Sequence, residues 1–437
     1  MASELTLSLL IGGTNPQPAP RVVIESLVSA SVTVSTTGKS GFDLSFAVST
    51  GSPLLTDLLP AGYFDPPTRV ILVATMAGTA TVLMDGVITF QEMVPNNEPG
   101  KSVLSIKGDD LTRMLDLIDL TGFPYPAMPA EARVALAVAK YAPLYGIVPL
   151  VMPSVLIDFP NPTVEIPAQR GTDLNYIKTL ADRVGYVFFI QPGPQPGKSL
   201  AYWGPMLRTA IPFLPTPSPI AIDWDGASNV ESLQFSFDGF AKTQWVVLIQ
   251  VNSLPVPIPV PDVNPISPPL GQKSPLPLKI SPMPGLAKYN PVQAAGIALA
   301  KAASTANVIS GQGTLDVLRY GSILPARTIV EVRGAGITYD GQYFVDAVTH
   351  TIKPGSHKQS FTLSRNALIA GGGHPLSYLA SPVQELSGFA ASATAAAPPA
   401  LPGGVGIATS PPGPVLGAPT QPPAGNGGRI AALPASP

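Results

Sequence analysis

Three histidines are the first side chains to consider for metal binding or acid–base chemistry in this 437-residue chain. His350 and His357 flank Pro354-Gly355, a dipeptide typical of a turn, so we expect them on adjacent strands of one hairpin. Asp346 could add a third ligand, but this spacing does not indicate a tetrahedral metal site. We therefore expect two solvated or hydrogen-bonded histidines here. The remaining one, His374, lies in a segment of low complexity.

Carboxylates cluster in two places. Asp109, Asp110, Asp116 and Asp119 are close in sequence, and a helix cap with an exposed helix face explains them better than an acid–base pair. The second cluster is Asp223-Trp224-Asp225-Gly226, which resembles part of a calcium loop. It lacks a third acidic ligand and the terminal glutamate, so a turn is expected instead.

Other motifs for catalysis or cofactor binding are weak or absent. Gly311-Gln312-Gly313 has no third glycine and follows no clear strand, which makes it a weak dinucleotide fingerprint. The chain has no cysteine and no GxSxG, HExxH or Walker A pattern. Five aromatic side chains on two expected strands have almost no flanking cations, which favours core packing over stacking on nucleic acid; they are Tyr186, Phe188, Phe189, Tyr202 and Trp203. The sequence predicts a protein that is not an enzyme, with no catalytic, cofactor-binding or metal-binding residues.

The composition indicates a folded protein with an unusually uncharged surface. Proline (53) and glycine (41) together make 94 of 437 residues, and charged residues make only 12 %, while 45 % are hydrophobic. The net charge of −2 and the absence of a Lys/Arg run argue against specific nucleic-acid binding. No apolar stretch approaches ~18 residues, so membrane insertion is not expected. Glu4 stands where a signal peptide needs positive charge, which favours assembly in the cytoplasm.

The elements that must carry these residues fall into segments. Residues 1–125 are expected to form a small, closed or nearly closed β domain, because runs of β-branched residues and period-two alternation predict strands throughout it. The expected strands are 21–27, 31–34, 42–46, 69–75, 79–84, 87–94 and 101–107. Asp109 or Asp110 should cap a short helix over 111–117.

Residues 126–220 are expected to form an α+β insertion domain. A helix should begin at Pro129 and end near Tyr141. A second helix, capped by Thr172 or Asp173, should end at Gly185 and lead into a buried strand and its hairpin partner.

Residues 221–370 are expected to form a second β domain, with an alanine-rich helix over 291–303. It includes a strap, residues 251–287, with eleven prolines, for which we expect extended polyproline geometry at the surface. A ligand for proline-binding partners is the alternative reading. The tail, residues 371–437, has a low-complexity composition rich in Pro, Gly and Ala.

An internal repeat links the two β segments. The first copy has Pro67-Thr68-Arg69-Val70-Ile71, then Asp85-Gly86 and Pro99-Gly100, each expected to make a turn between strands. The second copy has Pro325-Ala326-Arg327-Thr328-Ile329, then Asp340-Gly341 and Pro354-Gly355. Asp-Gly and Pro-Gly are fourteen residues apart in both copies. This matched spacing predicts a duplicated β domain, and three such chains around a threefold axis would present six similar domains.

Two stretches resemble a known family. The helix-then-strand segment Gln169-Arg170-Gly171-Thr172-Asp173-Leu174-Asn175-Tyr176-Ile177, with Leu180-Ala181-Asp182-Arg183-Val184-Gly185-Tyr186 after it, is similar to phage late-control protein D, the tail or baseplate hub. So is the end of the second β segment, with Tyr339-Asp340-Gly341-Gln342-Tyr343-Phe344-Val345, Val348-Thr349-His350 and Phe361-Thr362-Leu363-Ser364-Arg365-Asn366. The resemblance extends over about residues 21–369, and its motifs are structural rather than catalytic.

The resemblance implies a mainly β, α+β fold with two similar β-barrel-like hub domains. It also implies a homotrimeric, pseudo-sixfold ring that joins the sixfold tail tube, or a tube-initiator protein, to a trimeric spike in a phage tail or contractile injection system. Only a low-complexity tail follows residue 370, so the spike is expected to be a separate chain, and baseplate wedge components are further expected partners. A tail-associated or secreted cell-wall hydrolase with an unrecognised site is the alternative. A carbohydrate-binding or adhesin module is a third reading.

Overall fold

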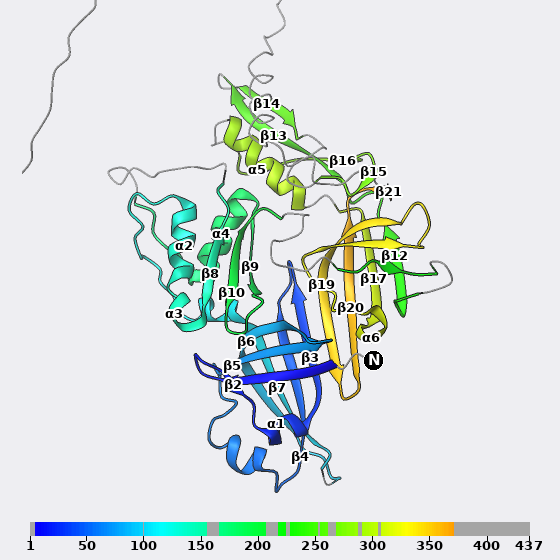
Figure 1. The fold of residues 1–437 in the computed structure, drawn as a ribbon. Helices are drawn as coiled ribbons and strands as arrows, with labels where there is room; N and C mark the ends of the chain where they lie inside the picture. The colour runs from blue at the N-terminus through cyan, green and yellow to red at the C-terminus, as the bar shows by residue number, and fades with distance from the viewer. Residues whose placement is uncertain are drawn as a thin grey trace, which may run out of the picture. The chain divides into compact units, whose positions relative to one another are not determined.

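The strands and helices are taken from a computed structural model (Figure 1). It describes residues 5–98, 100–154, 166–206, 217–223, 228–251, 254–260, 268–286, 291–304 and 307–370. Residues 224–227 of the Asp223 cluster, parts of the strap and the whole 371–437 tail lie outside the described residues.

Five antiparallel strands from the first β segment lie in one part of a large sheet. In sheet order they are β3 (Leu27–Ser35), β4 (Gly41–Val48), β7 (Ser102–Asp110), β6 (Thr79–Val94) and β5 (Arg69–Met76). Beyond β5 the sheet continues into β1 (Leu5–Gly12) and β2 (Gln17–Pro18). A π-helical turn, η1 (Leu54–Leu58), follows β4.

Strands from the second β segment repeat this order. They are β12 (Ser232–Phe237), β17 (Ile309–Asp316), β20 (Ser356–Arg365), β19 (Gly341–Lys353) and β18 (Ile329–Arg333). The short helix α6 (Val317–Tyr320) follows β17, and β11 (Ile220–Ala221) pairs with β18. The same five-strand order occurs twice in one chain, so the duplication predicted from the repeat is present at the level of topology.

The two five-strand sets join edge to edge. β19 pairs antiparallel with β3, from Ala347 opposite Ser35 to Ile352 opposite Ala30. All thirteen strands thereby belong to one sheet, with β3 and β19 side by side in Figure 1 although about 310 residues separate them. Within the described residues the strand path runs from β12 to β2 without closing into a barrel.

One hydrophobic cluster lies against this sheet and draws on both sets of strands. This cluster follows from period-two alternation: from Ala30 onward in β3, and throughout β4, every second residue is buried, while the residues between are partly exposed. Val32 and Leu44 of the first set and Val348 and Leu363 of the second are at most 1 % exposed and belong to the same cluster. The core is thus shared across the β3–β19 junction.

An α+β module lies between the two sets in sequence. Its sheet has the order β8 (Ile147–Val151), β10 (Ser199–Gly204) and β9 (Val187–Pro192). Its helices are η2 (Leu111–Asp116), α2 (Ala130–Ala139), α3 (Ala142–Tyr145) and α4 (Asp173–Val184). As predicted, the Thr172 side chain caps α4 by accepting from the backbone of Asn175, and Gly185 ends the helix at φ +71°.

Two buried arginines attach this module to the large sheet, one from each five-strand set. Arg69, beside Asp85, donates to the carbonyl of Tyr145 at 2.8 Å. Arg327 donates to the Gln191 side chain and lies over the Phe189 ring, 4.0 Å from its centroid. Burial lowers the pKa of Arg327 to about 10. Both halves of the sheet therefore hold the α+β module by charge-assisted hydrogen bonds.

The described part of the proline-rich strap is built into small sheets. β14 (Leu254–Pro259) pairs antiparallel with β13 (Thr243–Val251), and β16 (Lys279–Pro282) pairs parallel on the other side. β15 (Gly271–Lys273) pairs with β21 (Leu368–Ala370). Helix α5 (Pro291–Ser304), predicted from its alanine-rich sequence, packs on β13. The strap segments β14, β15 and β16 therefore have strand partners, which polyproline geometry alone does not provide.

Two local predictions are wrong. Arg21–Ser26, expected as a strand, is the helix α1, with an Arg21–Glu25 ion pair and Val23 fully buried, so packing overrides β propensity. Asp85-Gly86, expected as a turn, lies inside β6. Asp85 is buried there against Arg69, and a Cβ on Gly86 would lie 2.3 Å from the Asp109 carbonyl oxygen, so this glycine permits close backbone approach.

Candidate functional site: the polar face and edges of the large sheet

The predicted histidine pair forms a buried cluster in which the two rings are hydrogen-bonded to each other. His350 Nδ1 lies 3.1 Å from His357 Nε2, and the Gln359 amide nitrogen lies 3.4 Å from the same Nδ1. Burial lowers the pKa of His350 to about 3 and that of His357 to about 4, so both rings are neutral at pH 7. Among the described residues no three His, Cys, Asp or Glu side chains are placed to hold a metal ion.

Three carboxylates of the predicted cluster each accept hydrogen bonds from a different threonine. Asp110 is the N-cap of η2, as expected, and burial raises its pKa. Asp116 accepts from the Thr172 hydroxyl at 2.7 Å, and Asp119 accepts from Thr121. These groups serve separate turns, and they do not form a paired acid and base.

The remaining motifs also have structural roles. Gly311 and Gly313 lie within β17, where the ring atoms of Phe235 and Phe361 would be 3.0 and 2.5 Å from an added Cβ. They are places where rings pack on a strand, and not a phosphate loop. Of the predicted aromatic set, Phe189, Tyr202 and Trp203 are buried, as core packing requires.

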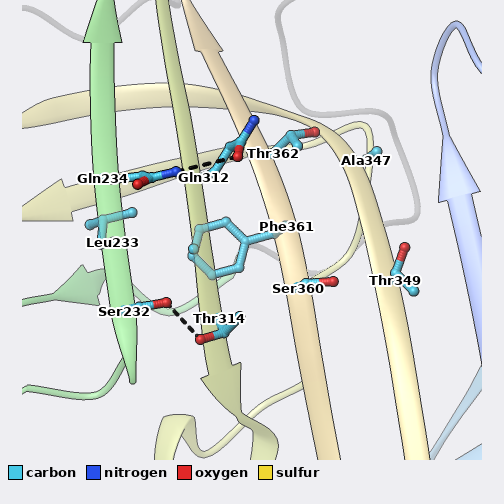
Figure 2. A pocket seen from close by; sticks show the side chains of 11 residues that line it. Ser232, Leu233, Gln234, Gln312, Thr314, Ala347, Thr349, Ser360, Phe361 and Thr362 are labelled. Carbon is cyan, nitrogen blue, oxygen red and sulfur yellow. Dashed lines mark hydrogen bonds between the residues drawn. The ribbon is translucent and has the colours of Figure 1, made fainter.

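What the sheet offers instead is a broad face of small, uncharged polar side chains. Figure 2 shows it across β12, β17, β20 and β19, where it is hollowed into a cavity of about 550 Å³. Ser232 and Thr314 are joined by a 2.7 Å hydroxyl hydrogen bond, and Gln234 donates to Gln312 at 3.4 Å. The other polar side chains lining it are Thr349, Ser360 and Thr362.

The same face continues across the junction into the first five-strand set. Thr33 and Thr349 bridge the junction by a 3.0 Å hydroxyl hydrogen bond. In the first set this face also carries charged side chains: Asp43 on β4, Lys107 on β7 and Glu92 on β6. Lys107 lies 3.3 Å from Glu92 and 4.0 Å from Asp43. The pairs Ser232–Thr314, Gln234–Gln312 and Thr33–Thr349 show that several of these hydroxyls and amides are hydrogen-bonded to one another across neighbouring strands.

The edges of the sheet that have no strand partner among the described residues include β12 and one stretch of β6. β12 ends the strand path, and the β6 stretch from Phe90 to Val94 pairs only with β7. Phe90, Met93 and Val94 are 52, 38 and 52 % exposed, which is unusual for large apolar side chains on a strand edge. An unpaired edge is a template for pairing with another chain.

Sequence reasoning missed both the face and its edges. The signal was present in part, since alternation such as Ser31-Val32-Thr33-Val34 marks one polar and one apolar face of a strand. Which strands are neighbours, and which edges stay free, depends on pairings more than 300 residues apart.

Comparison with solved structures places this fold among phage tail proteins. A tail protein from Neisseria meningitidis MC58 is similar with a TM-score of 0.54 and 14 % identity, over 82 % of this chain and 97 % of that one. The 43 kDa tail protein of prophage MuSo2 from Shewanella oneidensis has a TM-score of 0.53 and 11 % identity, over 83 % and 100 %. A Francisella PdpA–VgrG complex has a TM-score of 0.52 and 8 % identity, over 85 % of this chain and 60 % of the matched chain.

No family model and no curated protein matches the sequence. The likeness therefore lies in the fold, and it confirms at that level the expected resemblance to phage tail proteins. The described part of the chain contains no helix that is both long and apolar enough to cross a membrane.

Proposed function

We propose that this chain is a structural hub subunit of a contractile tail, forming a homotrimeric, pseudo-sixfold ring between the sixfold tail tube and a separate trimeric spike. The observation that carries the proposal is the repeated five-strand order within one continuous sheet. Each chain supplies two similar units, so three chains supply six. Such a ring matches threefold and sixfold neighbours at once.

Within this subunit we propose residues 1–125 and 221–370 as the two hub domains and residues 126–220 as the insertion domain. The hub is a structural component and not an enzyme, since the polar side chains described above close on one another in caps and pairs. Its expected partners are the tube or tube-initiator protein, the spike and baseplate wedge components. It would assemble in the cytoplasm and then become part of a phage tail or injection particle.

The test is the mass of the purified chain by light scattering at micromolar concentration. One chain is 45.2 kDa, so a trimer weighs about 136 kDa, three times that value. The proposal expects this mass, and a ring with six units around its opening by electron microscopy. A chain that stays monomeric, both alone and with a purified trimeric spike, would refute the ring.

A further inference from the structure

We infer that the free β6 edge of one chain pairs antiparallel with the free β12 edge of a second copy. This inference rests on the proposed ring and specifies the surface that builds it. Inside the chain, β19 of the second strand set pairs with β3 of the first. β6 holds the place of β19 in the first set, and β12 holds the place of β3 in the second. The intermolecular pair therefore repeats the internal one, with the roles of the two sets exchanged.

A β-bulge fixes how β6 corresponds to β19. In β6 the pairing with β7 shifts at Thr89, between Ile88 and Phe90. In β19 the pairing with β20 shifts in the same way at Asp346. Counting three residues onward from each bulge places Glu92 in the position of Thr349.

Strand pairing likewise fixes how β12 corresponds to β3. Lys107 pairs with Phe90 and Thr362 pairs with Ala347, each the first residue after a bulge, so Lys107 corresponds to Thr362. Two residues further along, Asp109 corresponds to Ser364. From Asp109 the register leads through Gly41 to Thr33. From Ser364 it leads through Ser310 to Ser236. Thr33 and Ser236 are thus equivalent. Since Thr349 pairs with Thr33, Glu92 should pair with Ser236 of the second copy.

The side chains along this register suit each other. On the polar face, the Glu92 carboxylate would meet the Ser236 hydroxyl, where the internal junction has the Thr33–Thr349 hydrogen bond. On the opposite face, Met93 would meet Phe235, in the place of buried His350 beside Val32. Met93 is 38 % exposed in the single chain, and contact with an aromatic ring is favourable for its thioether.

The next pair along the register buries a second exposed side chain. Phe237 is 42 % exposed at the end of β12, and Gln91 would lie opposite it. The pairing thus covers Met93 and Phe237 on the apolar face, and it satisfies the unpaired backbone groups of β6 and β12. A head-to-tail contact of this kind uses two different edges and closes into a ring where the rotation allows.

Cysteine cross-linking tests the register directly, because the full-length chain contains no cysteine. The variant Glu92→Cys/Ser236→Cys should oxidise to covalent dimers and closed trimers on a denaturing gel, since directly opposed residues are within disulfide reach. The matched control is Glu92→Cys/Ser232→Cys. It moves the second cysteine four residues, ~13 Å, along the same strand and should not cross-link.

An apolar variant provides an independent measurement. Met93→Asp should shift the light-scattering mass at micromolar concentration from trimer to monomer. The control Ile337→Asp replaces another exposed apolar residue, 81 % exposed and outside both edges, and should remain trimeric. Circular dichroism matching that of the unmodified chain shows that both variants are folded.

The outcomes separate this inference from the proposed function. A trimeric mass without the Glu92–Ser236 cross-link, or with the Ser232 control cross-linking instead, overturns the register and leaves the ring standing. A monomeric mass for the unmodified chain with spike present overturns both. A trimer that survives Met93→Asp unchanged also contradicts the inferred contact.

Discussion

At the scale of single residues, Arg69 and Asp85 form a buried ion pair with two hydrogen bonds. Nε and Nη2 of Arg69 bond the two carboxylate oxygens at 2.8 and 2.7 Å, with both side chains at most 3 % exposed. Ser199 donates to the same carboxylate at 3.0 Å. This pair links β5 and β6 to the α+β module, so its removal should affect more than one element.

Asp85→Asn should therefore destabilise the protein by about 3–5 kcal/mol, because it leaves the Arg69 charge buried without its counter-charge. The urea denaturation midpoint, followed by tryptophan fluorescence, measures the loss. Glu25→Gln is the control, since its pair with Arg21 is largely exposed and should contribute little to stability. Equal shifts for the two variants would contradict this account.

The histidine pair makes a second prediction at this scale. Burial lowers the pKa of His350 to about 3 and that of His357 to about 4, while the unfolded chain takes up protons near pH 6.5. Between those values the unfolded state binds more protons, so stability falls as the pH drops from 6.5 towards 4 and is unaffected by these groups above 6.5. His350→Gln/His357→Gln should lose less stability than the unmodified protein between pH 7 and pH 5.

At pH 5 the unmodified protein should have lost about 2 kcal/mol more stability per histidine than the variant, because pH 5 lies 1.5 units below the pKa of histidine in the unfolded chain. Urea midpoints at the two pH values measure it. Carboxylates titrate equally in both proteins and cancel in the comparison. If the stability of the two proteins depended on pH in the same way, the histidines would be taking up protons at the same pH in the folded and unfolded states, which contradicts their lowered pKa.

At the scale of elements, the ends of α4 and α6 offer a matched pair of glycines. Gly185 and Gly321 both end a helix in the left-handed region, at φ +71° and +83°. A Cβ on Gly185 would lie 2.7 Å from the backbone nitrogen of Lys301 in α5, whereas nothing lies within 4 Å of one on Gly321. The end of α4 is therefore in close contact with α5.

Gly321→Ala should cost about 1 kcal/mol, from backbone strain alone. Gly185→Ala should cost about 2–4 kcal/mol, because overpacking against α5 adds to the strain. Thermal denaturation of the two variants, measured side by side, tests the difference. If the two changes cost the same, α4 and α5 are not in the contact described here.

Element ends were predictable from sequence where the cause is local. Thr172 as a cap and Gly185 as a stop depend only on neighbouring residues, and both are confirmed. Arg21–Ser26 and Asp85-Gly86 were mispredicted because distant packing decides them: Val23 is buried in the shared core, and Asp85 faces Arg69. The strand order was predictable only through the repeat, and the free edges were not predictable at all.

At the scale of the whole molecule, the inferred seam between chains contains no pair of opposite charges. By the same register Glu92 faces Ser236 and Asp238 faces Phe90, and the other groups are backbone, apolar and small polar. Salt screens charge pairs at the surface but leaves hydrogen bonds between strands and apolar burial largely intact. The trimer should therefore keep its mass of about 136 kDa between 0.1 and 1 M NaCl. Light scattering across this range checks it, and dissociation at high salt would point to a charged interface elsewhere.

The junction between β3 and β19 also determines how the molecule carries force. Six residue pairs, from Ala347–Ser35 to Ile352–Ala30, join the two strand sets by antiparallel backbone pairing. A pull along these strands loads all the bonds of the junction together, in shear, whereas a pull across them opens the bonds one after another. The chain is thus mechanically directional: it resists sliding of its two halves far more strongly than peeling.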